Sequence, residues 1–324
     1  MIDDGQPLRA SVVVATRDRA HLLARLLEAL ERQTLPRGAF EIIVVDDQSR
    51  DGTGDLIARF CDRTSGPFQS FALPRSTGPA AARNLGARSA RGSIVAFTDD
   101  DCVPEADWLE AGLSAFSMGT AIVQGVTRAK AGTAGYGVQF SRTMEVDRED
   151  GHYPTCNIFY SREALERVGG FDESFRYACG EDTDLAWRVK AAGYDSRFCP
   201  KAVVTHDVRA PSFRIFLRER RRFAEQILLV KRHPHLRRFY YRRYFYQRSH
   251  VHAIAALSLI AAAGSGIWPA AALLPLVWLD RFRHTRLVGG WRHRALVAGE
   301  LLVGDFWELI VFCYGSLRYR TLLI

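Results

Sequence analysis

Short apolar runs alternate with amphipathic segments along the first part of the chain. Runs rich in β-branched residues predict strands at 11–15, 41–45, 69–73 and 93–97. Apolar residues at helical spacing predict helices at 21–32, from about residue 51, and at 77–90. Nearly continuous apolar strands separated by helices are typical of a parallel sheet covered on both faces. Ligands of such sheets bind beyond the carboxyl ends of the strands, where this chain places its polar clusters.

The same alternation continues to about residue 211. It predicts a helix at 105–116, a strand at 122–129, and helices at 161–168 and 181–192. Glycines follow both of the later helices, as is usual at helix ends. We therefore expect one α/β domain over residues 1–211.

The pattern changes after that point. Residues 212–250 interleave Lys and Arg with aromatic side chains, which predicts basic amphipathic helices at an interface. Residues 251–324 are mostly apolar and predict a hydrophobic helical membrane region. The chain is therefore expected to have three parts.

An uncharged segment of 27 residues, 253–279, lies in the last part. About 20 apolar residues span a bilayer as a helix, so the segment is long enough to cross once. Its glycines and prolines at 264, 266, 269 and 275 could instead break it into a shallow hairpin that returns to the same side. Residues 295–317 are apolar apart from Glu300, Asp305 and Glu308, which fall on one side of a helix and favour an amphipathic or protein-packed helix.

Charge is divided unevenly between these parts. The formal net charge is +8, but residues 1–211 hold 25 Lys/Arg and 30 Asp/Glu, whereas residues 212–324 hold 19 and 6. A slightly acidic body with a basic tail is therefore expected. The six cysteines form no CxxC pair, which favours reduced structural thiols, and the polar N-terminus lacks the pattern of a secretory signal. These features favour a cytoplasmic location for the first domain.

Three consecutive carboxylates, Asp99, Asp100 and Asp101, follow the strand at 93–97. Adjacent carboxylates repel one another, so their clustering is costly without a cation. Divalent ions such as Mg²⁺ take oxygen ligands and keep positions open for phosphate oxygens. The run therefore indicates either a metal site that holds a diphosphate or a solvated acidic turn before the next helix.

A second acidic run follows the strand at 41–45. Asp51 in this run is explained as a helix cap. A cap does not account for Asp46 and Asp47 side by side, one of which can accept hydrogen bonds from a nucleobase or ribose.

Six motifs occur in the order and spacing of family-2 glycosyltransferases of the GT-A fold, which this chain resembles. They are SVVVATRDR (11–19), IIVVDDQSRDGT (42–53), GPAAARNLGA (78–87), VAFTDDDCVPEADWL (95–109), REALERVGGFDESF (162–175) and GEDTDLAWRVKAAGY (180–194). The resemblance covers residues 11 to about 206. It implies a Rossmann-like, mostly parallel α/β sheet and the inverting transfer of a sugar from a nucleotide-sugar donor to a hydroxyl acceptor.

The resemblance also implies a donor pocket at the strand ends. Ala15, Thr16 and Arg17 would line the nucleotide pocket, and Asp47 would recognise the base, most often uracil in this family. The remaining residues expected to bind the donor are Asp46, Arg83, Asn84, Asp99 and Asp100.

A metal site is implied by the family's DxD motif, whose outer positions match Asp99 and Asp101. Asp101 would be the main ligand of Mn²⁺ or Mg²⁺, and Asp99 would lie near the ribose or the metal. His206 resembles the late histidine that completes the metal site in some GT-A enzymes, although a histidine near a strand end also occurs as ordinary polar surface. Cys102 stands where many relatives carry a further acid, so it is assigned no role.

Glu181 and Asp182 match the family's catalytic acidic pair at the start of a helix. Asp182 is the expected general base, which takes a proton from the acceptor hydroxyl as that oxygen attacks the anomeric carbon. Like-charge repulsion from Glu181 and Asp184 should raise the pKa of Asp182, and the helix N-terminus should lower it. The alternative is a set of acids that only stabilises the helix dipole. Asn157 and Trp187 are candidate acceptor contacts, although Trp187 is equally expected in the core.

The basic, aromatic segment 212–248 directly precedes the uncharged segment, which favours a membrane surface over nucleic acid as its partner. Lys and Arg would meet anionic headgroups, and aromatic rings would lie at the interface. The positive-inside tendency then places the catalytic domain on the cytoplasmic side of the inner membrane. The acceptor would be a lipid-linked or membrane-proximal glycan, as in cell-envelope polysaccharide biosynthesis. A soluble helical appendage with a buried core helix is the alternative.

Three functions fit these residues: a glycosyltransferase, a degenerate transferase that serves as a membrane scaffold, and a nucleotidyltransferase. Retention of all the acidic runs favours the first over the second. No GxxxxGK[ST] motif and no GxGxxG motif after a strand occurs, so nucleotide binding in the third would also rest on the acidic clusters. The QxxRW string of processive synthases is absent as well, which predicts transfer of one or a few sugars.

Overall fold

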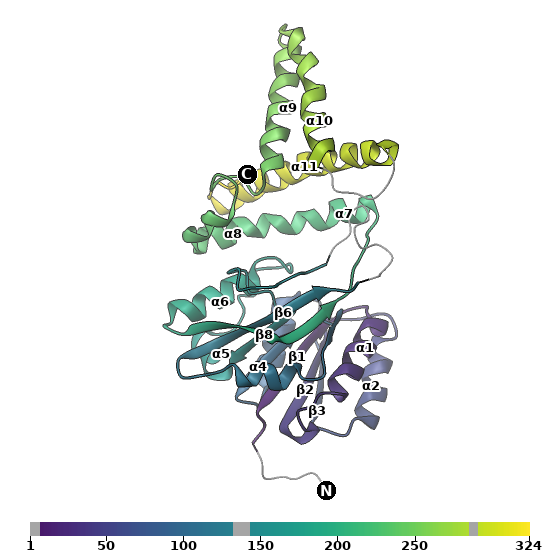
Figure 1. Cartoon of the computed structure of the whole chain (residues 1–324), viewed down its shortest axis with the longest axis vertical. Coiled ribbons are helices and arrows are strands. Elements are labelled where there is room, and N and C mark those ends of the chain that lie inside the picture. Colours follow the sequence, from purple (N-terminus) through teal and green to yellow (C-terminus); the bar gives the residue numbers. More distant parts are fainter. Residues whose placement is uncertain (1–6, 132–142, 285–290) are drawn as a thin grey trace. The chain divides into compact units, whose positions relative to one another are not determined.

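The computed structural model of the chain describes residues 7–131, 143–284 and 291–324, and it divides the chain into two compact units (Figure 1). Residues 7–131 and 143–207 belong to the first unit, and residues from 208 onwards to the second. Each unit is described separately.

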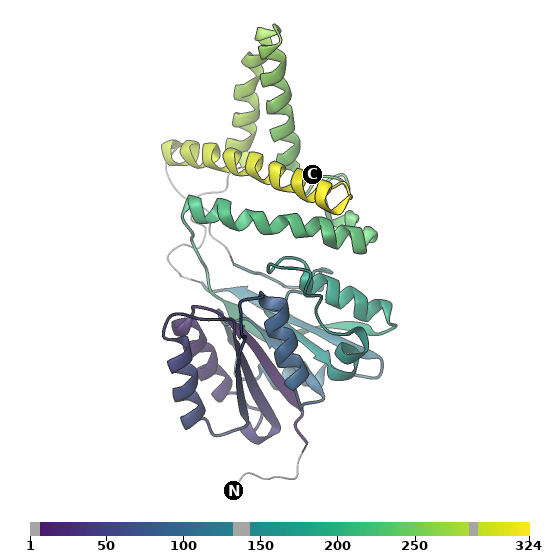
Figure 2. The same cartoon turned by 180° about the vertical axis from the view of Figure 1, so that it is seen from behind.

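The first unit is built on one sheet, seen from both sides in Figures 1 and 2. Its strands are β1 (Ala10–Thr16), β2 (Phe40–Asp46), β3 (Phe68–Ala72), β4 (Ile94–Thr98), β5 (Cys102–Pro104), β6 (Thr120–Ala129), β7 (Asn157–Ser161) and β8 (Asp195–His206). Its helices are α1 (Ala20–Glu31), η1 (Arg37–Ala39), α2 (Thr53–Arg63), α3 (Pro79–Ser89), α4 (Trp108–Ser114), α5 (Arg162–Val168) and α6 (Glu181–Ala191). The described strands lie in the order β3-β2-β1-β4-β7-β6-β8-β5.

The predicted strands and helices up to residue 129 are confirmed to within a few residues at their ends, apart from the short strand β5, which the pattern did not predict. The expected parallel pairing is confirmed for the first four strands of the order and also holds between β6 and β8, but the sheet as a whole is mixed. The pairs among β3, β2, β1 and β4 are parallel, but β7 runs antiparallel to both β4 and β6, and β5 runs antiparallel to β8. An apolar run indicates that a strand is buried but not its direction, which the connection between strands decides.

Both faces of the sheet are covered because successive strand residues point to opposite sides. Val12 and Val14 join one buried core together with residues of α1, α2 and α4, whereas Val13 joins a second core with residues of α3, α5 and α6. Ile42 and Ile43 divide between the two cores in the same way. This double burial explains why the strands read as continuous apolar runs.

The second unit is helical in its described residues. It contains α7 (Phe213–Arg220), η2 (Arg221–Ala224), α8 (Glu225–Arg232), η3 (Pro234–Phe239), α9 (Arg248–Gly264), η4 (Trp268–Leu273), α10 (Leu274–His284) and α11 (Trp291–Tyr319). The long helix α11 contacts α7, η2, α8 and α9. The side chains of Asp305 and Glu308 are buried, which confirms the expectation of a protein-packed helix.

The uncharged segment forms a helical hairpin, in which α9 and α10 lie side by side (Figures 1 and 2). Helix α9 ends at Gly264, and Gly266 adopts a left-handed backbone with φ +102°, which glycine tolerates without strain. The segment is thus broken at its glycines and prolines, as in the second of the two alternatives, and the return of the hairpin to one side of a membrane stays a prediction. No helix in the described part of the chain combines the length and the apolarity needed to cross a bilayer.

Candidate active site

The carboxyl ends of β1, β2 and β4 lie along one edge of the sheet. In the register of these parallel strands, Thr16 is paired with Asp46, and Val13 with Phe97 near the end of β4. The residues that follow the three strands therefore share that edge, as the apolar pattern predicted. The polar clusters at 15–17, 46–47 and 99–101 all belong to it.

Asp47 lies among polar groups just after β2. Its carboxylate accepts hydrogen bonds from Ser76 Oγ at 3.0 Å and from the backbone amide of Thr77 at 3.2 Å. Arg17, half of whose side chain is exposed, lies with Nη1 at 3.7 Å from the carboxylate and donates to Ser76 Oγ. Ala15, which pairs with Val45 of β2, is partly buried. An acceptor held among donors in this way can also accept from the N–H of a nucleobase.

Asp46 is used differently from its neighbour. Its Oδ1 accepts from the backbone amide of Ser49 at 3.0 Å and from Ser49 Oγ, which fixes the turn after β2. Asp51 accepts from the amides of Thr53 and Ala20, as expected of a residue at a helix start. A turn thus accounts for Asp46 within the protein, and its expected contact with the donor stays a prediction.

The three acids after β4 divide between two arginines. Asp99 pairs with Arg83 Nη2 at 2.9 Å. Asp100 turns back towards β1, where it accepts from Thr16 Oγ1 at 2.8 Å. Arg19 Nη1 lies 2.6 Å from Asp100 Oδ1 and 3.0 Å from Asp101 Oδ2. Burial raises the pKa of Asp100 to about 6, although Arg19 and Thr16 act in the opposite direction.

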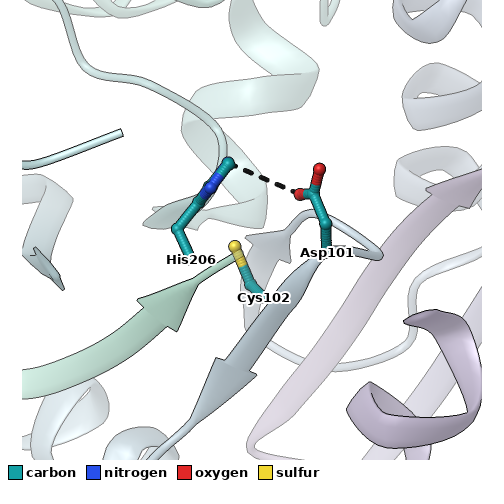
Figure 3. A group of neighbouring side chains, drawn as sticks. All are labelled: Asp101, Cys102 and His206. Carbon is teal, nitrogen blue, oxygen red and sulfur yellow. Dashed lines mark ion pairs between the residues drawn. The ribbon is translucent and has the colours of Figure 1, made fainter. Parts of the chain in front are cut away.

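Asp101, Cys102 and His206 bring three possible metal ligands together, with one donor atom of each within 4.8 Å of the others (Figure 3). Cys102 and His206 are cross-strand partners on β5 and β8, so their side chains share one face of the sheet. His206 Nε2 faces Asp101 Oδ1 at 3.5 Å. Asp99, which was expected to share the metal, is not a member of this group.

The imidazole of His206 is oriented by its other nitrogen. Nδ1 lies 2.7 Å from the carbonyl oxygen of Asp207, which can only accept, so Nδ1 carries a proton. In the neutral ring, Nε2 therefore directs a lone pair towards a carboxylate. A cation between the two groups would satisfy both, and a backbone carbonyl behind a metal-binding histidine is a common arrangement. The donor set therefore fits a divalent metal ion.

Glu181 and Asp182 begin α6, directly after Gly180, whose φ of +98° suits glycine. Glu181 is only 2% exposed and accepts from Arg83 Nη1 at 2.9 Å, whereas Asp182 is partly exposed. Arg83 therefore connects the DxD acids with the acidic pair. Of the two acids in that pair, Asp182 is the more exposed.

Burial, more than charge repulsion, sets the protonation of this pair. It raises the pKa of Glu181 to about 8, with a further contribution from Asp182 and opposition from Arg83. Burial also raises the pKa of Asp182, against the hydrogen bond from the amide of Thr183 and the charge of Arg83. Asp184, expected to contribute repulsion, is instead paired with Arg188 at 2.8 Å. A raised pKa suits a general base that works near neutral pH.

Asn157 is placed differently from the expectation that it faces an acceptor. It is 1% exposed, donates to the carbonyl oxygens of Val126 and Ala202, and accepts from Trp108 Nε1 at 2.8 Å. The amide thus joins β6, β7, β8 and α4 inside the core, and none of its hydrogen-bonding groups remains for a substrate.

Two further candidates brace neighbouring segments. Asn84 is also buried. Its Oδ1 accepts from the backbone amide of Phe171, and its Nδ2 donates to the carbonyl oxygen of Phe171 and to Glu173 at 2.9 Å. Trp187 is partly buried and donates Nε1 to the carbonyl of Gly151 at 3.0 Å. Their expected contacts with donor and acceptor stay predictions.

Sequence reasoning missed Arg19 and the place of Cys102 beside His206. Arg19 stands inside the first motif, but nothing in the local pattern distinguishes it from Arg17. The position of Cys102 became visible only through the pairing of β5 with β8, strands that are separated by almost 100 residues.

Comparisons with known proteins identify the relatives of this chain. The family model described as "Glycosyl transferase family 2" matches residues 11–169, and that described as "Glycosyl transferase family group 2" matches residues 94–298. The chain is 30% identical over 206 residues to glycosyltransferase AglE of Haloferax volcanii, covering 61% of this chain and 67% of that protein. It is 33% identical over 214 residues to the pre-mycofactocin glycosyltransferase of Mycobacterium tuberculosis, covering 61% of this chain and 43% of that protein. The chain thus spans less than half of the mycobacterial relative.

Solved structures share the fold. The mannosyltransferase PcManGT from Pyrobaculum calidifontis, in complex with GDP-Man and Mn²⁺, has a TM-score of 0.65 at 21% identity, covering 95% of this chain and 90% of that one. Residues 1–349 of S. aureus TarS, in complex with UDP-GlcNAc, have a TM-score of 0.52 at 21% identity, covering 68% and 67%. At these identities the likeness establishes a GT-A-like α/β architecture.

Proposed function

The chain belongs to glycosyl transferase family 2, and from that premise we propose an inverting, metal-dependent transferase that moves one or a few sugars from a nucleotide sugar to a hydroxyl acceptor. The observation that carries the proposal is a pair of adjoining ion-pair clusters, built on the consecutive acids Asp99, Asp100 and Asp101 after β4. One contains Arg19, Asp100, Asp101 and His206, and the other joins Asp99 through Arg83 to Glu181 in the acidic pair on α6.

Each part of the site has a role in the proposed reaction. Asp47 and Arg17 hold the nucleotide, with a uracil base favoured. Asp101 and His206, with Cys102 beside them, would hold a divalent cation, which when bound stabilises negative charge on the departing diphosphate. The imidazole in this set favours Mn²⁺ over Mg²⁺, because magnesium prefers oxygen ligands.

Asp182 acts as the general base. The residue is partly exposed, and its raised pKa lets its carboxylate take the proton of the acceptor hydroxyl as that oxygen attacks the anomeric carbon. The attack and the departure of the diphosphate occur in one step on opposite sides of the carbon, which inverts its configuration. Glu181, held by Arg83, keeps this guanidinium next to Asp99.

The second unit supports a proposal for the acceptor. The hairpin exposes large apolar side chains, among them Trp268 at 76% and Leu276 at 60%, and basic residues are dense in α7, η2 and α8. Apolar insertion together with basic residues is the usual combination for binding an anionic lipid surface. We therefore place the enzyme at the cytoplasmic face of the inner membrane, acting on a lipid-linked or membrane-proximal glycan.

The test is a thermal-shift and product-release screen of the full chain with UDP-, GDP- and dTDP-sugars, with and without Mn²⁺. A stabilisation that needs both nucleotide and metal, followed by release of nucleoside diphosphate, is expected for one donor class. Asp101→Ala should lose the dependence on metal, and Asp182→Asn should keep binding while turnover falls about 10³-fold. Unchanged turnover in both variants would contradict the assigned roles.

A further inference from the structure

Arg19 occupies a position that a metal-dependent site would not obviously need. Its Nη1 lies between two acids of the DxD run, 2.6 Å from Asp100 Oδ1 and 3.0 Å from Asp101 Oδ2. Both carboxylates are almost completely buried, with 4% and 7% of their side chains exposed. An internal guanidinium thus supplies positive charge where the family places a cation.

The two oxygens of Asp101 face different groups. Oδ2 accepts from Arg19, and Oδ1 lies 3.5 Å from His206 Nε2, the other proposed metal ligand (Figure 3). A divalent cation held by Asp101 and His206 would therefore share its carboxylate with a guanidinium. Two positive charges on one carboxylate repel each other, so each weakens the binding of the other.

The backbone of Arg19 is fixed by hydrogen bonds, whereas its side chain is partly exposed. The Arg19 amide donates to Thr53 Oγ1, and its carbonyl accepts from the amides of Leu22 and Leu23 at the start of α1. The side chain is 30% exposed, in contrast to Arg83, which is 8% exposed and clamped between Asp99 and Glu181. Of these two arginines, only Arg19 can exchange its partners without opening the core.

We propose that Arg19 is an internal counter-cation that competes with the divalent metal for Asp101 and releases it when the diphosphate of the donor arrives, so that metal and diphosphate bind cooperatively. This inference rests on the proposed function. A guanidinium binds phosphate oxygens through two parallel hydrogen bonds, which offers Arg19 an alternative to the carboxylates.

Asp101 has a cationic partner in both states. Without ligand, Arg19 pairs with Asp100 and Asp101; with ligand, the metal pairs with Asp101 and Arg19 with the diphosphate, and Asp100 keeps the hydrogen bond from Thr16 Oγ1. Neither state leaves Asp101 buried and unpaired, which would be strongly destabilising. Without diphosphate, only the small fraction of molecules in which Arg19 has left Asp101 can bind the metal, so the apparent affinity for metal is low. The diphosphate increases this fraction and thereby raises the apparent affinity.

The experiment is a titration of the full chain with Mn²⁺, followed by the electron paramagnetic resonance signal of the free ion, with and without UDP or GDP. Arg19→Met removes the charge, and Arg19→Lys keeps it on a group that cannot form the bidentate contact. Arg162→Met is the matched control, because it removes the same charge from an exposed side chain away from the acids. Arg162 follows β7, whose last residue pairs with the first residue of β4, whereas the acids follow the last residue of β4. Thermal unfolding checks that each variant is folded.

Wild type should bind Mn²⁺ weakly alone and about tenfold or more tightly with the nucleoside diphosphate. Arg19→Met should bind Mn²⁺ alone about tenfold more tightly than wild type and lose most of the cooperativity, Arg19→Lys should be intermediate, and the control should equal wild type. If wild type shows cooperativity and Arg19→Met retains it, the inference is overturned while the proposed function stands. If Mn²⁺ does not bind to wild type even with nucleotide, and Asp101→Ala behaves identically, both fail.

Discussion

Two arginines allow a cluster of carboxylates to exist at one edge of the sheet. Arg83 pairs with Asp99 and Glu181, and Arg19 pairs with Asp100 and Asp101. Without these guanidinium groups, the acids would have to bind protons or cations to be buried. The raised pKa values of Asp100 and Glu181 indicate that the compensation is incomplete.

Glu181 shows most clearly that the arginines compensate the buried acids only in part, because burial raises its pKa from 4.5 to about 8. The folded protein therefore binds this proton more tightly than the unfolded chain, and stability falls as the pH rises from about 4.5 towards 8. The Glu181→Gln side chain cannot ionise. From about pH 6 to about pH 9, the free energy of unfolding should therefore fall further in wild type than in Glu181→Gln, by ~1 kcal/mol or more.

Urea unfolding of the metal-free protein at both pH values measures this difference. The exposed Glu166→Gln is the control and should follow wild type. An equal loss of stability in wild type and Glu181→Gln would show that Glu181 ionises normally in the folded protein.

At the scale of secondary structure, the candidate site residues follow the ends of strands, and hydrogen bonds of buried polar side chains hold neighbouring strands together. Asn157, at the start of β7, joins three strands and α4 through three hydrogen bonds. Gly125 on β6 lies so close that an added Cβ would be 2.4 Å from the Asn157 amide nitrogen. This close packing explains why Asn157 is buried in the core, whereas the sequence had suggested that it contacts an acceptor.

Asn157→Ala should therefore lower the free energy of unfolding by about 3 kcal/mol, because it leaves buried partners unsatisfied. Trp187→Phe, which loses one hydrogen bond at a partly buried site, should cost about 1 kcal/mol. Urea unfolding measures both changes. A stable Asn157→Ala with a raised KM for the acceptor would restore Asn157 as a substrate contact.

Helix α11 is held by a buried ionic cluster in the second unit. Glu308 accepts from Arg220 at 2.6 Å and Gln247 at 2.6 Å, and lies 3.1 Å from His250. Asp305, one turn earlier, accepts from Ser249 at 3.0 Å. These contacts join α11 to α7 and to the start of α9.

Glu308→Ala should destabilise the second unit by about 3 kcal/mol, because it leaves Arg220 without its carboxylate. Hydrogen exchange resolved by peptide should then be faster in α9 and α11 and unchanged in β1 and β4. Ile310→Ala, on the exposed side of α11, should leave exchange near that of wild type. Unaltered protection in Glu308→Ala would contradict a stabilising role of the cluster.

At the scale of the whole molecule, the two units differ in what they expose. The first unit buries its apolar residues in two cores, whereas the hairpin of the second presents Ile260, Ile267, Trp268 and Leu276 to its surroundings. Exposed apolar patches of this kind mark interaction surfaces. The basic residues of the same unit favour an anionic lipid surface as the partner.

The full chain should therefore float with vesicles that contain anionic phospholipid, and bind neutral vesicles more weakly. The double variant Trp268→Ser with Leu276→Ser should bind at least about tenfold more weakly, because each side chain loses its transfer into the lipid. Met118→Ser removes an exposed apolar residue of the first unit and is the matched control. Equal flotation of wild type and the double variant would show that the hairpin does not contribute to membrane binding.

The sequence alone determined the strands up to residue 129 other than β5, the edge of the sheet where polar groups gather, and the family, because apolar periodicity and motif order are local properties of the chain. The buried, protein-packed side of α11 followed from its three acids in the same way. Only the tertiary structure decided the antiparallel direction of β5 and β7, the choice of the hairpin, the buried place of Asn157, the group of Asp101, Cys102 and His206, and the pairing of Arg19 with the acids. These features depend on contacts between residues far apart in the chain, and burial, hydrogen-bond saturation and charge compensation exist only once those contacts form.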